Sequence, residues 1–185
     1  RYDYPQLHFL EYTTEYAEND NYYTIQIKNE EEYKNKIAEI DSVIKDLVDE
    51  VNKETSLITK YRLINDWIVK NLEYDFKYSD FVIQWREGQT TEEYHGYMRN
   101  SNADNIYGAI VEKKAVCSGI AKAFKYICLK CDLDCMVVTG MVGEDGHEWN
   151  VVPIYGNYFL IDCTWELESY IEYGTYLVKD KNTGA

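Results

Sequence analysis

The first half of the chain carries apolar residues at helical spacing. From Asn29 onward they recur at steps of three and four residues, which is typical of the buried face of an amphipathic helix. The positions are Tyr33, Ile37, Ile40, Ile44, Leu47 and Val51. Residues 30–32 are all Glu and complement the positive end of the helix dipole. A second helix is expected after Thr55 or Ser56, either of which can act as its N-cap.

The segments on either side of these helices have a different pattern. Residues 1–28 are rich in Tyr, and residues 22–27 have the aromatic and β-branched character of a strand. They are therefore expected to form an N-terminal extension before a core at 29–185, within a single domain overall. Residues 75–107 lack a steady period, which predicts a long irregular segment acting as a lid or loop.

The last third of the chain predicts one helix followed by three strands. After Val116 a single apolar stripe runs through Ile120, Phe124 and Ile127. Strand-like stretches follow at 135–141, 147–154 and 158–164, and Gly-containing turns separate them. Helices therefore come first and an antiparallel meander comes last, which predicts an α+β fold.

Charge and length narrow the classes of function. The chain of 185 residues has a formal net charge of -14, which argues against nucleic-acid binding. This acidity suits solubility, although it would also favour a Lys-rich substrate. No stretch approaches the roughly 20 apolar residues of a membrane helix. The chain opens at Arg1 without an initiator Met or a leader, so it is expected to be a piece of a longer protein.

Five cysteines leave at least one thiol unpaired within the chain. Cys128, Cys131 and Cys135 have a C-x2-C-x3-C spacing that invites a zinc hypothesis. No second ligand pair is spaced to complete such a site, so we favour small buried hydrophobic residues. A disulfide between two of the three stays open, and no metal is predicted.

Cys117 is the candidate nucleophile, because it falls where a loop ends and a helix begins. A helix N-terminus favours the thiolate, and such placement can lower the pKa of a thiol from about 8.5 into the range of roughly 3.5–7.5. Ser118 and its small neighbours leave room for a substrate backbone above the sulfur. Backbone N–H groups at the same helix start are candidates for an oxyanion hole.

His147 and Asp162 are the candidate base and its orienting carboxylate. His147 opens a predicted strand after a Gly-rich turn, and Asp162 ends the next one. With Tyr155 and Gly156 as a two-residue loop, Asp162 is a same-face diagonal neighbour of His147. With Gly156 and Asn157 as the loop, the offset grows and a bulge is needed to bring the two together.

The roles of the three residues follow from their chemistry. His147 would accept the proton of the Cys117 thiol and later donate a proton to the leaving group. Asp162 would fix the tautomer of the imidazole and stabilise its positive form. Attack on an amide gives a thioester, which water or an amine can open.

Three sequence blocks resemble the transglutaminase-like superfamily of papain-fold thiol enzymes. They run through residues 115–124 around Cys117, 146–150 around His147 and 161–165 around Asp162. The resemblance implies a helical lobe carrying the Cys, packed on an antiparallel sheet carrying the His and the Asp. It also implies acyl chemistry on a Gln side chain or peptide bond, without an organic cofactor. A second oxyanion donor upstream of the Cys is implied too, for which Trp85 and Tyr107 are candidates, and Ser118 and Trp149 are further candidates for substrate contact.

The sequence therefore predicts a thiol enzyme, either a cysteine protease or a transglutaminase or deamidase, acting on protein or peptide substrates. The alternative is a non-catalytic binding or adhesion module of the cell envelope on the same fold. Family members of this size suggest a bacterial protein at an extracellular or envelope location, whereas several free thiols favour the cytoplasm. The sequence does not determine the oligomeric state or whether the reaction is hydrolysis or transfer to an amine.

Overall fold

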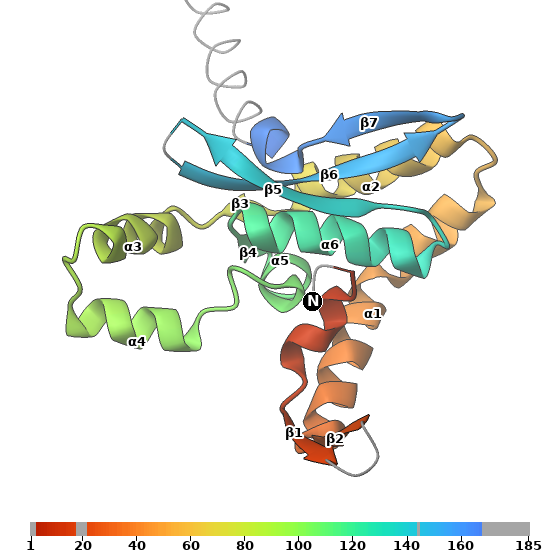
Figure 1. Cartoon of the computed structure of the whole chain (residues 1–185). Coiled ribbons are helices and arrows are strands. Elements are labelled where there is room, and N and C mark those ends of the chain that lie inside the picture. The colour runs from red at the N-terminus through yellow and green to blue at the C-terminus, as the bar shows by residue number, and fades with distance from the viewer. Residues whose placement is uncertain (1–2, 18–21, 144, 168–185) are drawn as a thin grey trace, which may run out of the picture.

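The structure is a computed structural model, and it describes residues 3–17, 22–143 and 145–167. Figure 1 shows helices packed beneath a small sheet, with one pair of helices and one hairpin projecting from them. In chain order the elements are η1 (Pro5–Phe9), β1 (Tyr12–Ala17), β2 (Tyr22–Ile27), α1 (Glu30–Lys53), α2 (Leu57–Asn71), β3 (Glu73–Tyr74), α3 (Phe76–Arg86), α4 (Glu92–Asn100), α5 (Ile106–Ile110), β4 (Lys114–Ala115), α6 (Cys117–Lys130), β5 (Met136–Val142), β6 (Asp145–Ile154) and β7 (Asn157–Ile161). The predicted α+β class is confirmed.

Helices α1 and α2 form where the apolar spacing predicts them. The predicted stripe of α1 is its buried face, with Ile40, Ile44 and Val51 at most 1% exposed. Of the two expected N-caps of α2, Ser56 is the one used, and its hydroxyl accepts a hydrogen bond from the backbone N–H of Thr59 at 3.4 Å. Both helices pack against α6 and therefore support it.

Helix α6 and the sheet β5–β6–β7 make the core of the fold (Figure 1). The sheet is antiparallel, and one face of β6 is buried against α6 through Asn150, Val152 and Ile154. The side chain of Asn150 donates to the backbone carbonyl of Ala121 in α6 at 2.9 Å. Because this polar contact crosses an otherwise apolar interface, it fixes how the sheet lies on the helix.

The prediction of an irregular segment at 75–107 is wrong for much of its length, because α3 and α4 form there. Helix α3 buries only Phe81 and α4 only Tyr94, so neither shows an extended apolar stripe. The two residues pack edge to face, with ring centroids 5.7 Å apart. Asp75 and Thr91 cap the two helices with their side chains. We call residues 75–100 the arm, and Figure 1 shows it projecting to one side of the core.

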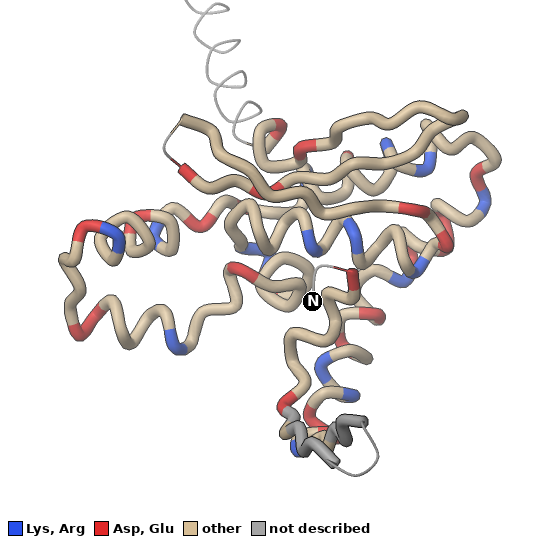
Figure 2. The backbone as a smooth tube through the Cα atoms, viewed as in Figure 1, with Lys and Arg blue, Asp and Glu red and all other residues tan. Residues whose placement is uncertain are grey.

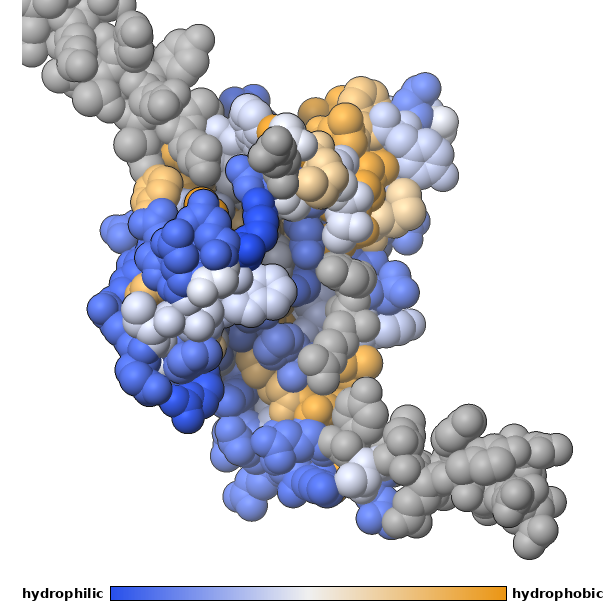
Figure 3. All heavy atoms as spheres, turned by 60° about the vertical axis from the view of Figure 1, so that its left-hand side comes forward, coloured by the Kyte–Doolittle hydropathy of each residue, from blue (hydrophilic) through white to orange (hydrophobic). Residues whose placement is uncertain are grey.

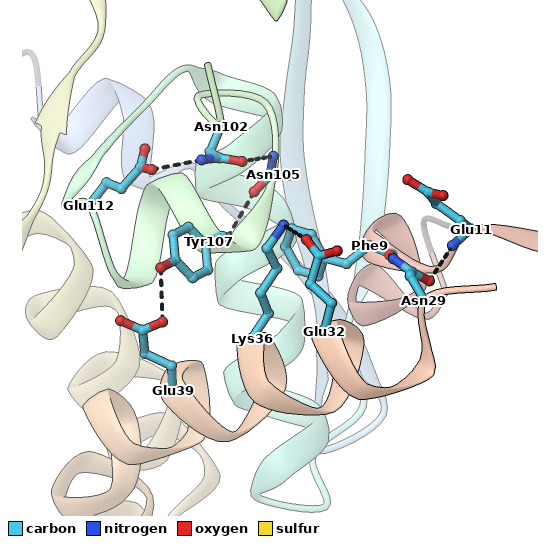
Figure 4. Close-up of polar contacts among 10 residues, drawn as sticks. All are labelled: Phe9, Glu11, Asn29, Glu32, Lys36, Glu39, Asn102, Asn105, Tyr107 and Glu112. Atoms are coloured by element: carbon cyan, nitrogen blue, oxygen red, sulfur yellow. Dashed lines mark hydrogen bonds and ion pairs between the residues drawn. The ribbon is translucent and has the colours of Figure 1, made fainter. Parts of the chain in front are cut away.

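The N-terminal strand predicted at 22–27 is confirmed as β2, which pairs antiparallel with β1. The chain between this hairpin and the core is tied at Asn29, whose side chain accepts from Glu11 N at 2.8 Å and donates to Phe9 O at 2.7 Å (Figure 4). Phe9 itself is buried against the helices. The N-terminal residues thus contribute to the core as well as forming a projecting hairpin.

Charge is distributed unevenly over these parts. Charged residues are spread along the helices, whereas the sheet carries only Asp145 and Glu148 (Figure 2). In Figure 3 the arm has come forward and presents a mainly hydrophilic surface. Within the described residues, every helix is too short or too polar to cross a membrane.

Candidate active site

Cys117 is the first residue of α6, and tight packing fixes its position. The preceding residue, Val116, donates its backbone N–H to Ala103 O at 2.9 Å. A Cβ atom added at Gly119 would stand 2.4 Å from the same Ala103 oxygen, so only glycine lets the first turn of α6 approach this loop. The hydroxyl of Ser118 donates to Asp104 O at 3.1 Å. The helix start is therefore held against residues 103–104.

The surroundings of Cys117 raise the pKa of its thiol, contrary to what its place at a helix start predicts. Burial is the main cause, and the negative charges of Glu148 and Asp162 add to it. The backbone N–H groups of Glu148 and Ser118 hydrogen-bond the sulfur and act in the opposite direction. Because the neutral thiol is favoured, forming the thiolate requires a base that takes its proton.

His147 and Asp162 lie in direct contact. The imidazole Nε2 is 2.7 Å from Asp162 Oδ2, and the two side chains are 12% and 25% exposed. Of the two loops weighed from the sequence, Tyr155–Gly156 is the one present, because Ile154 pairs with Asn157. Both loop residues have positive φ, 49° and 82°, as a two-residue type I′ turn requires. In this register Asp162 follows the last paired residue of β7 and comes opposite Trp149, which shares a face of the sheet with His147. Asp162 is therefore the diagonal neighbour of His147 on that face.

Asp162 also starts a helical turn that the sequence does not predict. The strand expected to reach Thr164 ends at Ile161, and residues 163–167 are helical. The second carboxylate oxygen of Asp162 accepts from the backbone N–H of Trp165 at 3.3 Å, as an N-cap does. One carboxylate therefore holds both the imidazole and this turn.

Two indole rings flank His147. Trp149 stacks on the imidazole with centroids 5.7 Å apart, and Trp165 lies edge-on at 6.1 Å. A Cβ atom at Gly140 would meet the Trp149 ring at 2.5 Å, so this glycine makes room for the stacked indole. Trp165 belongs to the Asp block of the sequence resemblance but is not among the predicted site residues. Its only sequence indication is the spacing of three residues from Asp162.

The indole N–H of Trp165 competes for the same imidazole nitrogen as Asp162. Trp165 Nε1 lies 2.9 Å from His147 Nε2. If Nε2 carries the proton, it donates to Asp162, and Nδ1 can accept a proton from a thiol. If Nε2 carries the lone pair, it accepts from Trp165 instead, and Nδ1 is protonated. The adjacent carboxylate favours the first tautomer, which is the one a general base needs.

Cys117, His147 and Trp165 line a single pocket of about 290 Å³. One wall of the pocket is formed by α3, which contributes Tyr78, Ser79, Val82, Ile83 and Arg86. Two of the lining residues, Arg86 of α3 and Asp145 of β6, form an ion pair, with Nη1 and Oδ1 2.8 Å apart. The pocket therefore lies between the core and the arm.

The structure does not place every candidate in this pocket. The hydroxyl of Tyr107 donates to Glu39 of α1 at 2.8 Å, away from the pocket (Figure 4). Trp85 is 63% exposed and does not line the pocket. Ser118 uses its hydroxyl to hold the helix start, and Trp149 lies behind the imidazole. Tyr78 of α3, which the sequence does not predict as a site residue, lines the pocket instead.

The other four cysteines are buried free thiols rather than disulfides. Burial raises the pKa of Cys128 and of Cys163 well above the ordinary thiol value, and that of Cys131 to about 11. Across the described ranges, no three His, Cys, Asp or Glu side chains are grouped closely enough to hold a metal ion. All four are at most 4% exposed and pack as small side chains of the core.

Comparison with known proteins places the fold in a family. Kyphoscoliosis peptidase of Homo sapiens is 25% identical over 138 residues, which cover 68% of this chain and 18% of that protein. A crystal structure described as a TGase superposes with a TM-score of 0.54 at 18% identity, covering 83% of this chain and 44% of the other. The chain thus spans less than half the length of either protein. A family model described as a transglutaminase-like domain matches residues 38–184, and the chain therefore belongs to this transglutaminase-like domain family.

Proposed function

We propose that the protein is a thiol enzyme that acts on protein or peptide amides through Cys117, His147 and Asp162. The observation that carries the proposal is the 2.7 Å contact between His147 and Asp162 in the wall of the pocket that Cys117 lines. An Asp–His pair beside a thiol at a helix start has the chemistry of an activated nucleophile.

The reaction begins with a proton transfer. His147 Nδ1 takes the proton of Cys117, and Asp162 stabilises the resulting imidazolium through Nε2–H. The thiolate sulfur attacks the carbonyl carbon, and the electron pair of the C=O bond moves to oxygen. The tetrahedral intermediate then collapses, the imidazolium protonates the departing amine, and a thioester to Cys117 remains. Water releases an acid from this thioester, whereas a primary amine forms a new amide.

The environment of the thiol makes the base necessary. Burial and nearby carboxylates raise the pKa of Cys117, so little thiolate forms at neutral pH without His147. Conversely, a positively charged imidazolium beside the sulfur would offset the effect of the two carboxylates on the pKa of the thiol. The relevant state is therefore a thiolate–imidazolium pair rather than an isolated thiolate.

Alkylation with iodoacetamide tests this proposal. The wild-type protein should label at Cys117 faster than a small free thiol near neutral pH. The His147→Asn variant should label slowly, with a rate that still rises above pH 9, because the raised pKa of the thiol is then uncompensated. The other four cysteines are at most 4% exposed and provide an internal control. Wild-type labelling no faster than that of a free thiol would refute the proposal.

Mass spectrometry of a casein-like substrate, with and without a primary amine, then separates the outcomes. Cleavage, deamidation and cross-linking give three different mass changes. Each change should be absent with Cys117→Ala. A product that persists in this variant would show that the chemistry does not use the thiol. Binding that survives in the variant, with no product from the wild type, would instead support the alternative of a binding module.

A further inference from the structure

The pocket beside Cys117 gathers exposed apolar side chains from three separate parts of the chain. Ile83 of α3, Val142 at the end of β5 and Trp165 of the turn after β7 all line it. These side chains are 41%, 42% and 53% exposed, and none of the three is part of the hydrophobic core. Single exposed apolar residues are common on protein surfaces, whereas a group that converges on one concave site is typical of a site that binds an apolar ligand.

Strand register places Val142 close to the candidate base. His147 of β6 pairs with Gly140 of β5, and Val142 follows Gly140 by two residues, so Val142 and His147 lie on the same face of the sheet. Two residues along a strand span roughly 7 Å, so the side chain of a substrate residue next to the reacting amide can reach Val142. Trp165 lies at the same base, with its Nε1 2.9 Å from His147 Nε2.

An ion pair joins the element that carries Val142 to the one that carries Ile83. Val142 pairs in the sheet with Asp145, whose carboxylate lies 2.8 Å from the guanidinium of Arg86 in α3. Ile83 precedes Arg86 by three residues, so the two lie on the same side of this helix. Figure 1 shows this end of the β5–β6 hairpin on the side of the core from which the arm projects. The two apolar side chains therefore line the pocket from elements that the ion pair connects.

The charges around the pocket do not favour a charged side chain at this position. Arg86 and Asp145 compensate each other, since they form an ion pair. The net charge of the whole chain is -14, which disfavours the approach of acidic peptides. An apolar side chain that covers Ile83, Val142 and Trp165 removes apolar surface from water on both partners. The chemistry of these three residues therefore fits an aliphatic or aromatic side chain.

We propose that Ile83, Val142 and Trp165 form a subsite for an apolar side chain next to the reacting amide. The substrates are then peptide segments with Leu, Ile, Val, Met or Phe at that position. This inference rests on the proposed function, because it names the substrate class of the reaction at Cys117. Binding at the subsite is noncovalent, and the three residues take no part in the bond changes.

Two pairs of reagents that alkylate thiols test the subsite on each side of the reacting carbonyl. One pair is chloroacetyl-leucinamide and chloroacetyl-serinamide, and the other is the chloromethyl ketones of acetyl-leucine and acetyl-serine. Because only the side chain differs within a pair, the Leu-to-Ser ratio of labelling rates at Cys117 cancels the intrinsic reactivity of the sulfur. We expect a ratio of about 10 or more in at least one pair, since a small gain in apolar contact gives discrimination of this order.

A double variant, Ile83→Gln with Val142→Thr, tests whether these residues cause the preference. Both replacements are polar and close in size to the original side chains, and both positions are exposed, so the fold should be retained. We expect the Leu-to-Ser ratio to fall to about 2 or less. Ile58→Gln is the matched control, because Ile58 of α2 is 56% exposed and does not line the pocket. Its ratio should equal that of the wild type.

The absence of a preference for Leu in both pairs overturns the inference, and so does a preference that survives in the double variant. Slow labelling of the wild type by iodoacetamide would instead refute the proposed function, and the Leu-to-Ser ratio does not depend on that rate.

Discussion

The core around α6 and the arm of residues 75–100 form opposite walls of one pocket, but they are held by different interactions. Helix α6 buries eight residues between the sheet and the other helices, whereas α3 and α4 bury one each. The arm is attached instead by polar contacts. Asp75 N donates to Ala115 O at 3.0 Å, and the Asp75 carboxylate lies 3.6 Å from Lys114 Nζ. The exposed ion pair of Arg86 and Asp145 is a further contact. In the proposed reaction, the core would hold the reacting residues and the arm would form the opposite wall that a substrate contacts. This division suggests tests in which equivalent changes in the two regions have unequal effects.

The largest effect is expected in the core, from Asp162→Asn. An amide N–H at this position would donate to His147 Nε2, as the indole of Trp165 already can, and would place the proton on Nδ1. That tautomer cannot accept a proton from the thiol. We expect the turnover rate on an amide substrate to fall by roughly 10⁴-fold, with a near-wild-type melting temperature.

The matched change in the arm is Thr91→Ala, which removes an N-cap far from the reacting atoms. It should cost about 1 kcal/mol in local helix stability and leave the turnover rate within a small factor. If Asp162→Asn retains wild-type activity, His147 is not oriented by this carboxylate.

How much of this difference between core and arm is predictable from the sequence depends on how far apart in the chain the contacting residues lie. The helices α1, α2 and α6 follow from local spacing, because their apolar stripes lie close together in the chain. For the turn at 155–157 the sequence leaves two registers open, and the structure has the one with Tyr155 and Gly156 as the loop. The contact of His147 with Asp162 follows from the same register.

The arm and its wall of the pocket were not predictable in this way. With one buried side chain in each helix, α3 and α4 leave almost no periodic pattern, and their caps at Asp75 and Thr91 resemble ordinary loop residues. The position of Tyr78 depends on a contact of Asp75 with Ala115, forty residues later. Trp165 faces His147 because a helical turn replaces the last part of a predicted strand. Both features depend on contacts that local sequence spacing does not report.

Two glycines give a second comparison, now in stability. Gly119→Ala in α6 would place a methyl group 2.4 Å from a backbone oxygen and 3.0 Å from the Cβ of Ala115. Neither neighbour is a flexible side-chain end, so we expect a net loss of about 2 kcal/mol despite the better helix propensity of Ala. Gly96→Ala in α4 meets no atom within 4 Å and should gain about 0.5–1 kcal/mol.

Urea denaturation of the two variants measures the direction of both changes in the free energy of unfolding. The midpoint for Gly119→Ala should fall and that for Gly96→Ala should rise. Equal shifts of the same sign would contradict the picture of a tightly packed core beside a loosely packed arm. A further check is alkylation of Cys117, which should change in Gly119→Ala because the helix start must move.

The smallest effect is expected at the ion pair that joins the two walls. Arg86 and Asp145 are 47% and 69% exposed, so their interaction is screened and should contribute about 0.2–1 kcal/mol to stability. We expect Arg86→Gln to leave the melting temperature and the alkylation rate of Cys117 nearly unchanged. Its effect should instead fall on KM for a peptide substrate, because both residues of the pair line the pocket. A double-mutant cycle with Asp145→Asn, at low and high salt, isolates the pair. A coupling that salt does not weaken would mean that the pair is shielded from solvent and that the arm is held more rigidly than its sparse packing implies.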